Sequence, residues 1–150
     1  MRKTENLILE NADFFQIAQE FLESGQQVKF TLKGFSMLPF LSQGDAIWLE
    51  AAKYSELRTG DILLVKWKGL FILHRLVFRN RTQLYLAGDN NLFRIEKVSC
   101  DDVMARVTRF ERKGKQVSAA GAEQRIRGIL WFMMRPVRWA KYSIAKILRR

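Results

Sequence analysis

Apolar side chains recur at helical spacing between residues 11 and 24, which predicts a short helix near the N-terminus. Asn11 or Asp13 could cap the start of this helix, and Gly25 suits its end. We expect this helix to cover an edge or a face of a sheet, because the pattern that follows it is typical of strands.

From residue 27 onward, apolar and polar positions alternate in short runs, as they do in half-buried β-strands. Residues 27 to 33 place three apolar side chains on one side of the first strand. Further strands are predicted at residues 45–50, 61–67, 70–78, 83–87 and 103–110. Lys68 and Gly69 fit a tight hairpin between two of them. The pattern therefore predicts a mainly β-fold with mixed, mostly antiparallel pairing.

Residues 121 to 150 differ in kind, because apolar side chains recur there every three or four positions, as on an amphipathic helix. Pro136 predicts a kink or break within it. The apolar stripe comprises Ile126, Ile129, Leu130, Met133, Val137, Ala140, Ile144 and Leu148, and Trp131, Phe132, Trp139 and Tyr142 widen it. We therefore divide the chain into an N-terminal helical segment (1–26), a central domain (27–110) and a linker with a basic amphipathic helix (111–150).

The formal net charge of +11 comes mostly from this last segment, since residues 125–150 hold eight basic and no acidic side chains. Aromatic rings beside cations, without acids, are typical of a helix at a membrane interface. We expect residues 125–150 to bind an anionic membrane surface. A terminal helix that packs on its own domain and exposes a basic face fits the apolar pattern equally well, and the missing acids favour the membrane.

A chain of 150 residues suits one domain of ordinary size. Its short basic start is followed by only three apolar residues before Glu10, which does not predict a signal peptide. No run of about 18 to 20 apolar residues predicts a conventional transmembrane helix. We expect a cytoplasmic or peripheral-membrane protein. Cys100, the single cysteine, cannot form an internal disulfide, and no Cys/His cluster predicts a metal site or another cofactor.

Three short segments carry the candidate chemistry. A serine hydroxyl is a weak nucleophile until a base takes its proton, and the chain has a single histidine. Ser36, His74 and Asp89 could supply the nucleophile, the general base and the orienting carboxylate. Each also has an ordinary structural alternative, as a loop residue, a half-buried strand residue and a turn former. Strand alternation places His74 and Arg75 on opposite faces.

The motifs around these residues resemble the peptidase domain of signal peptidases and LexA-like proteases over about residues 28–108. The matching residues are Ser36, Met37, Pro39, Leu41, Gly44, Asp45, Gly60, Asp61, Ile62, His74, Arg75 and Gly88 to Asn91. In that superfamily the bacterial leader peptidases and the LexA-like repressors use a lysine base, and the endoplasmic-reticulum type uses histidine. His74 therefore makes the chain most similar to the endoplasmic-reticulum type.

The resemblance also implies the remaining parts of a site. In the endoplasmic-reticulum type a second acidic residue follows the Gly-Asp-Asn-Asn segment, but here Phe93, Arg94 and Ile95 occupy those positions, with Glu96 next. Asp89 is thus our first candidate for the third member and Glu96 a distant second.

The nucleophile loop departs from the family's Ser-Gly-Ser-Met, because Gly34 and Phe35 precede Ser36. Gly34, Phe35 and Met37 then form the expected oxyanion and substrate loop, where backbone amides replace the missing hydroxyl. Pro39 fits the first turn of a short helix whose N-terminal amides would favour negative charge near Ser36. The Gly-Asp pairs at 44–45 and 60–61 are predicted as turns that enter strands.

The function implied is a serine endopeptidase that cleaves a signal or leader peptide of a precursor protein through an acyl-enzyme. One alternative is a non-catalytic peptide-binding relic of the same fold. Another is a LexA-like regulatory protease. We do not expect nucleic acid as a partner, because about 27 residues before the core are too few for a helix-turn-helix domain.

Overall fold

The computed structural model of the protein describes residues 12–149, and Asn11, one of the two predicted caps, lies outside them. Within this range the chain forms eight strands in one antiparallel sheet, three α-helices and two short 3-10 turns. The strands are β1 (Val28–Thr31), β2 (Ala46–Glu50), β3 (Ile62–Trp67), β4 (Leu70–Arg79), β5 (Gln83–Ala87), β6 (Glu96–Ser99), β7 (Val103–Arg112) and β8 (Lys115–Ser118). The helices are α1 (Ala12–Glu23), α2 (Ala122–Met133) and α3 (Arg135–Leu148). The predicted mainly β-fold is confirmed.

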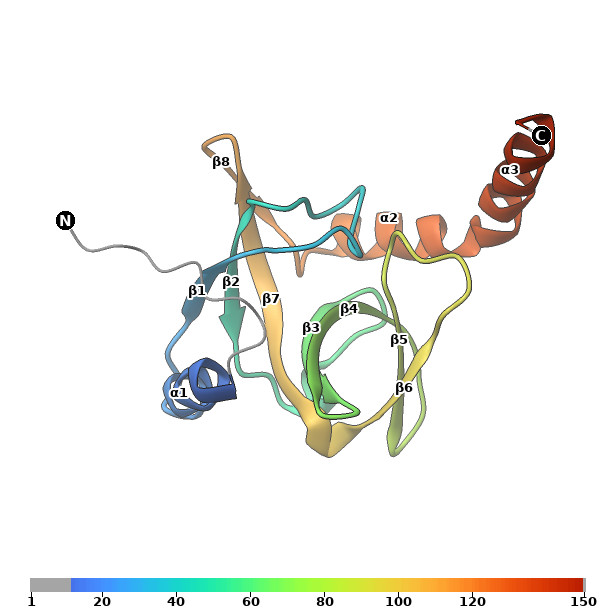
Figure 1. The fold of residues 1–150 in the computed structure, drawn as a ribbon. Helices are drawn as coiled ribbons and strands as arrows, with labels where there is room; N and C mark the ends of the chain where they lie inside the picture. The colour runs from blue at the N-terminus through green and yellow to red at the C-terminus, as the bar shows by residue number, and fades with distance from the viewer. Residues whose placement is uncertain (1–11, 150) are drawn as a thin grey trace.

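The strands pair in the order β1-β2-β7-β3-β4-β5-β6, and β8 adds to β7 as a hairpin. The long strand β7 is paired with both β2 and β3, so it joins the two halves of the sheet (Figure 1). The pairing shifts register within β2, β3 and β4. Such irregularities bend strands, and here the sheet curls around its own core instead of lying flat.

Every strand that we predicted is present, with its ends within two residues of the predicted ones. The hairpin between β3 and β4 turns at Lys68 and Gly69, which both have positive φ (48° and 77°), as a type I′ turn requires. The same dipeptide at Lys113 and Gly114 (φ 50° and 74°) makes the β7–β8 hairpin. Our predicted linker from residue 111 is therefore wrong in its first part, and the repeated Lys-Gly signal could have shown it.

Two clusters of buried side chains form the core. The first cluster lies between α1 and the β1-β2-β7 half and includes Phe15, Leu22, Leu32, Met37, Leu41, Ile47, Leu49, Leu64, Leu73 and Val107. The second cluster lies in the β3-to-β6 half and contains Leu57, Leu63, Val65, Leu76, Leu84, Leu86 and Val98. Alternation along β4 sends Leu73 to the first cluster and Leu76 to the second.

Helix α1 covers the first cluster, as the apolar spacing predicts. Phe15 is 1% exposed and its ring stacks on Phe71 of β4, with 4.1 Å between the ring centroids. Leu22, one helical repeat further along, is buried in the same cluster. The helix therefore closes the side of the sheet that lies away from α2 (Figure 1).

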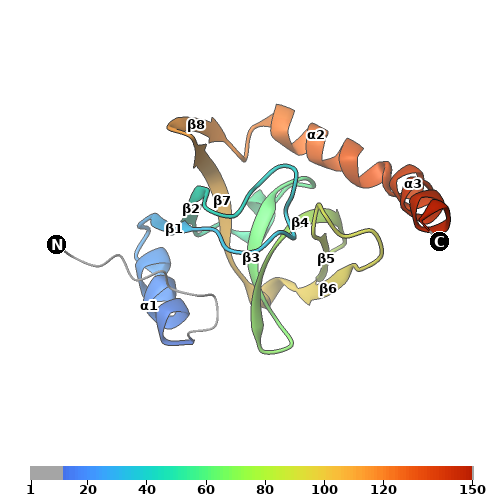
Figure 2. The same cartoon turned by 45° about the horizontal axis from the view of Figure 1, so that its top comes forward.

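The C-terminal segment forms two helices that meet at Met134, and Pro136 lies in the first turn of the second helix, so the predicted break is present. Helix α2 runs along one end of the sheet, and α3 turns away from it (Figure 2). In the part of the chain that the structure describes, no helix combines the length and the hydropathy needed to cross a bilayer.

Candidate active site

The single histidine is held by a carboxylate from a strand two positions away in the sheet. His74, on β4, is 8% exposed, and its Nδ1 lies 2.9 Å from Oε2 of Glu96, the first residue of β6. Strand β5 lies between them, and its Leu86 is paired with Leu76 on one side and Glu96 on the other. A carboxylate accepts the hydrogen bond, so Nδ1 carries the proton and Nε2 is left as the basic nitrogen.

That Nε2 atom faces the segment of Ser36. Ser36 lies in an exposed turn after β1, and its carbonyl oxygen accepts a hydrogen bond from the amide of Asn90 at 2.9 Å. A Cβ atom placed on Gly88 would be 2.8 Å from that carbonyl oxygen and 3.1 Å from His74 Nε2. The structure thus brings the Ser36 turn and the basic nitrogen of His74 to the same point, and only glycine leaves this point open.

Asp89 does not bind His74, which corrects our first choice for the orienting carboxylate. Its two oxygens accept hydrogen bonds of 2.7 Å each from Nε and Nη2 of Arg75. Both side chains are buried, at 4% and 1% exposure. Burial raises the pKa of the Asp89 carboxyl above its usual value, and the hydrogen bonds from Arg75 oppose this rise. Because Arg75 and His74 point to opposite faces of β4, each recruits a different acid.

The resemblance makes Glu96 only the second candidate, and its contact with His74 depends on a strand that the pattern does not reveal. Strand β6 reads Glu-Lys-Val-Ser, with one strongly apolar residue, and it was not predicted. The loop from Gly88 to Ile95 sets which residue of β6 lies beside Leu86, and this register brings Glu96 to His74. Its 1% exposure marks it as a buried acid with a specific partner.

The turn that contains Ser36 is anchored to the core by a buried side chain. Met37 is 1% exposed and belongs to the first cluster, so its side chain anchors the turn and is not itself available to a substrate. Gly34 has φ +90° and donates its amide to Gln43 Oε1 at 3.2 Å. Phe35 is 61% exposed and stands beside Ser36. Of the three predicted loop residues, Gly34 and Phe35 are accessible.

Pro39 does not start a helix. Residues 36 to 40 form turns, and the Leu38–Pro39 peptide bond is cis. No helical N-terminus therefore lies next to Ser36 in this turn, and the expectation of a helix dipole there is wrong.

The two Gly-Asp pairs act as turns, as expected. Asp45 Oδ2 accepts the amide hydrogen of Ser42, three residues earlier, at 2.8 Å. Asp61 Oδ2 accepts that of Arg58, also three residues earlier and at 2.8 Å. The equal geometry shows that each carboxylate closes the turn that enters a strand.

The C-terminal helices reach the same region, which the sequence did not reveal. Trp131 Nε1 of α2 donates to the carbonyl oxygen of Asp89 at 2.8 Å, and Arg138 Nη1 of α3 donates to the same oxygen at 3.1 Å. Gly128 of α2 lies directly on the Arg75 guanidinium, since a Cβ there would be 2.2 Å from its Cζ. Helix α2 therefore covers the Arg75–Asp89 ion pair and holds the loop next to Gly88.

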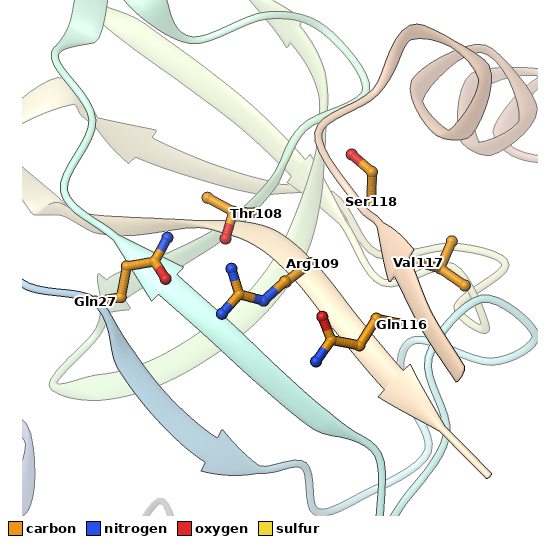
Figure 3. Close-up of a pocket in the computed structure, with 6 residues that line it drawn as sticks. All are labelled: Gln27, Thr108, Arg109, Gln116, Val117 and Ser118. Carbon is orange, nitrogen blue, oxygen red and sulfur yellow. The ribbon is translucent and has the colours of Figure 1, made fainter. Parts of the chain in front are cut away.

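A separate pocket lies on the β7–β8 hairpin (Figure 3). It is lined by Gln27, Thr108, Arg109, Gln116, Val117 and Ser118. Arg109 stacks over the Trp48 ring at 4.6 Å from its centroid, so it has a structural partner already. The lining holds no base that could activate a hydroxyl, and the candidate chemistry remains with Ser36 and His74.

Comparison with known proteins identifies the family of the chain. The model of one protein family, described as Peptidase S24-like, matches residues 3–117, which is most of the chain and includes Ser36, His74 and Glu96. No curated protein matches the chain significantly.

Proposed function

Because the chain belongs to the Peptidase S24-like family, we propose that it is a serine endopeptidase with Ser36 as nucleophile, His74 as base and Glu96 as orienting carboxylate. The observation that carries this proposal is the hydrogen bond from His74 Nδ1 to Glu96, which leaves Nε2 facing the Ser36 turn at Gly88. A base held in one tautomer beside an exposed serine is the arrangement that nucleophilic catalysis needs.

In the proposed reaction, His74 Nε2 takes the proton of Ser36 Oγ as this oxygen attacks the scissile carbonyl. The imidazolium then gives that proton to the leaving amine, and an acyl-enzyme on Ser36 remains. His74 next deprotonates a water molecule, which hydrolyses the ester and frees Ser36. Glu96 keeps its negative charge throughout and stabilises the imidazolium.

The oxyanion of this reaction would be held by backbone amides of the Ser36 turn, since Gly34 stands where the family's motif has the serine that can donate a hydroxyl. The Gly34 amide is engaged by Gln43, so it does not point to a substrate. Loss of one oxyanion donor typically lowers turnover by about 100- to 1000-fold. We therefore expect a slow or narrowly specialised peptidase.

The substrate class that we propose is a signal or leader peptide bound in extended form. Ser36 follows β1 and Glu96 begins β6, and these are the two end strands in the pairing order of the described sheet. An extended peptide can add to such an edge through backbone hydrogen bonds. The resemblance implies small residues near the cleaved bond, and the exposed Phe35 directly precedes Ser36.

The histidine base supports a closer similarity to the endoplasmic-reticulum type than to the lysine-dependent members of the superfamily. Lysine carries out the base role without a carboxylate partner, whereas a histidine needs one to fix its tautomer. The Glu96 contact supplies that partner.

Labelling with a serine-reactive fluorophosphonate tests the proposal. We expect the probe to label Ser36 in the full-length protein, and Ser36→Ala and His74→Ala to abolish labelling. Ser55→Ala, which changes an exposed serine in another turn, is the matched control and should be labelled normally. Equal labelling of Ser36→Ala and the parent protein would show that another residue reacts and would refute the assignment.

A non-catalytic peptide-binding protein of the same fold is the second candidate, and the exposed Phe35 next to Ser36 favours it. The same experiment separates the two. Such a protein would bind an extended peptide but show no acylation of Ser36, and binding would survive Ser36→Ala.

A further inference from the structure

Helix α3 is attached to the rest of the molecule by arginines. Arg138 donates to the carbonyl oxygens of Asp89 at 3.1 Å and of Trp131 at 3.3 Å. Arg135 donates to the carbonyl oxygen of Arg94 at 3.1 Å. Burial lowers the pKa of both guanidinium groups from the ordinary value, as expected for side chains that face the protein. The polar side of α3 is therefore its inner side.

The apolar side of α3 faces solvent. Its members follow helical spacing and are Val137, Ala140, Ile144, Ile147 and Leu148, which we call the apolar face of α3. Ile144, Ile147 and Leu148 are 57%, 71% and 80% exposed, and none of the residues of α3 is buried. An amphipathic helix normally turns this side to a core, so here the apolar face lacks the contact that its pattern requires.

Helix α2 also exposes apolar side chains. Ile126, Leu130 and Met133 recur at intervals of four and three residues and are 59%, 56% and 67% exposed. In Figures 1 and 2 the two helices extend beyond the sheet at one end of the molecule, with α3 turned away from it. This end of the molecule therefore presents two apolar helix surfaces that no other part of the described chain covers.

The positive charge around this surface favours an anionic partner. Residues 124–149 contain no acidic side chain, and Lys141, Lys146 and Arg149 are exposed on α3. A second copy of the chain would bring the same cations to the same place, which repulsion disfavours. Anionic lipid headgroups complement cations, and the acyl region below them accepts apolar side chains. We propose that the apolar face of α3 docks on the surface of an anionic lipid bilayer, with the helix axis in the plane of the interface.

Docking of α3 on a bilayer would hold the candidate active site close to the bilayer surface. Arg138 joins α3 to the carbonyl of Asp89, whose neighbour Gly88 abuts His74 Nε2. The helix is thus tied directly to the loop beside the nucleophile. Resting on the proposed peptidase function, this connection implies substrates that are peptide segments at the bilayer surface.

Vesicle flotation of the full-length protein tests the proposal. We expect it to float with vesicles of phosphatidylcholine mixed with phosphatidylglycerol and to stay behind with phosphatidylcholine alone. Added salt should weaken the binding, because it screens cations from the headgroups. Replacing Lys141 and Lys146 together by Gln should weaken binding to the anionic vesicles in the same direction.

A pair of matched double variants isolates the apolar contribution. Ile144→Asn with Ile147→Asn should lower vesicle affinity by about tenfold or more, because two large apolar side chains leave the buried face. Ser143→Asn with Ala145→Asn places the same amides in the same turn but outside the apolar face and should bind like the parent protein. Circular dichroism of both variants checks that α3 is still helical.

Equal flotation of the two double variants would overturn the proposal, and so would equal binding to neutral and anionic vesicles. A protein that floats with neither, but forms a dimer that only the Ile144 and Ile147 variant dissociates, would show that a second copy covers the face. Fluorophosphonate labelling of Ser36 should be unchanged in both variants. Failure of membrane docking is therefore distinguishable from failure of the peptidase assignment.

Discussion

The imidazole Nδ1 of His74 lies 2.9 Å from Glu96 Oε2, although the two residues are separated by a whole strand of the sheet. The neighbouring residue Arg75 binds Asp89 on the other face of the same strand. Two acids near one histidine thus have different partners and different consequences. We expect the first pair to affect reactivity and the second to affect the stability of the fold.

Glu96→Gln should slow acylation of Ser36 by about 1000- to 10,000-fold, because an amide can donate to Nδ1 and stabilise the wrong tautomer. The rate of fluorophosphonate labelling measures this effect. Glu56→Gln, which changes an exposed glutamate, is the control. A labelling rate for Glu96→Gln equal to that of the control would show that His74 needs no carboxylate.

Asp89→Asn should act on stability. It leaves the charge of Arg75 buried without its counter-ion, which typically costs about 3 to 5 kcal/mol of unfolding free energy. Urea unfolding measures this cost, with Asp101→Asn at an exposed site as control. Adding Arg75→Met should restore part of the loss, since a buried ion pair can often be replaced by apolar side chains. A similar midpoint for Asp89→Asn and Asp101→Asn would contradict the prediction.

Gly88→Ala should abolish acylation while the protein remains folded. The new methyl group would lie 2.8 Å from the carbonyl oxygen of Ser36 and 3.1 Å from His74 Nε2, so the nucleophile turn must move away from the base. Gly114→Ala tests the opposite case, because that position has φ +74° and open space around it. It should lower stability by about 1 kcal/mol and leave labelling unchanged. Normal labelling of Gly88→Ala would place the reacting groups elsewhere.

Trp131→Phe should slow labelling of Ser36 severalfold with little loss of stability. The substitution removes the hydrogen bond to the carbonyl of Asp89, while an aromatic ring still packs near Phe40. A positioning role predicts a slower labelling step at unchanged probe affinity, so the rate should be measured as a function of probe concentration. Trp139→Phe, at an exposed site on α3, is the control. If both variants label alike, the indole hydrogen bond has no role in positioning.

Two truncations should behave differently. Ending the chain after Met134 removes α3 and keeps Gly128 and Trp131 over the Arg75–Asp89 pair, so the protein should fold and label. Ending it after Gly121 also removes α2 and exposes the pair, and thermal unfolding should then occur at a clearly lower temperature. Equal melting temperatures would show that α2 contributes no stability.

Strand positions and the hairpin at Lys68 could be predicted from the sequence because alternation and turn residues are local signals. Ser36 and His74 stand in recognisable motifs, so the sequence singles them out as candidates. Glu96 could not be ranked correctly, since its contact depends on the register of β6 against β5. The contacts of Trp131 and Arg138 with Asp89 were also unpredictable, because they join segments more than 40 residues apart and depend on how closely α2 packs on Arg75 at Gly128.

The division of the core into two clusters has a further consequence for how the protein would lose activity. Met37 fixes the nucleophile turn in the first cluster, while Leu76 and Leu86, beside the His74–Glu96 pair, belong to the second. The reacting atoms are therefore mounted on separate halves of the molecule. A misplacement of about 1 Å can cost a reaction 100-fold. A small increase in the distance between the two halves, caused by heat or by a cavity elsewhere in the core, would therefore lower turnover before unfolding is visible by spectroscopy. Turnover should thus report loosening of the packing between the two clusters earlier than a melting curve does.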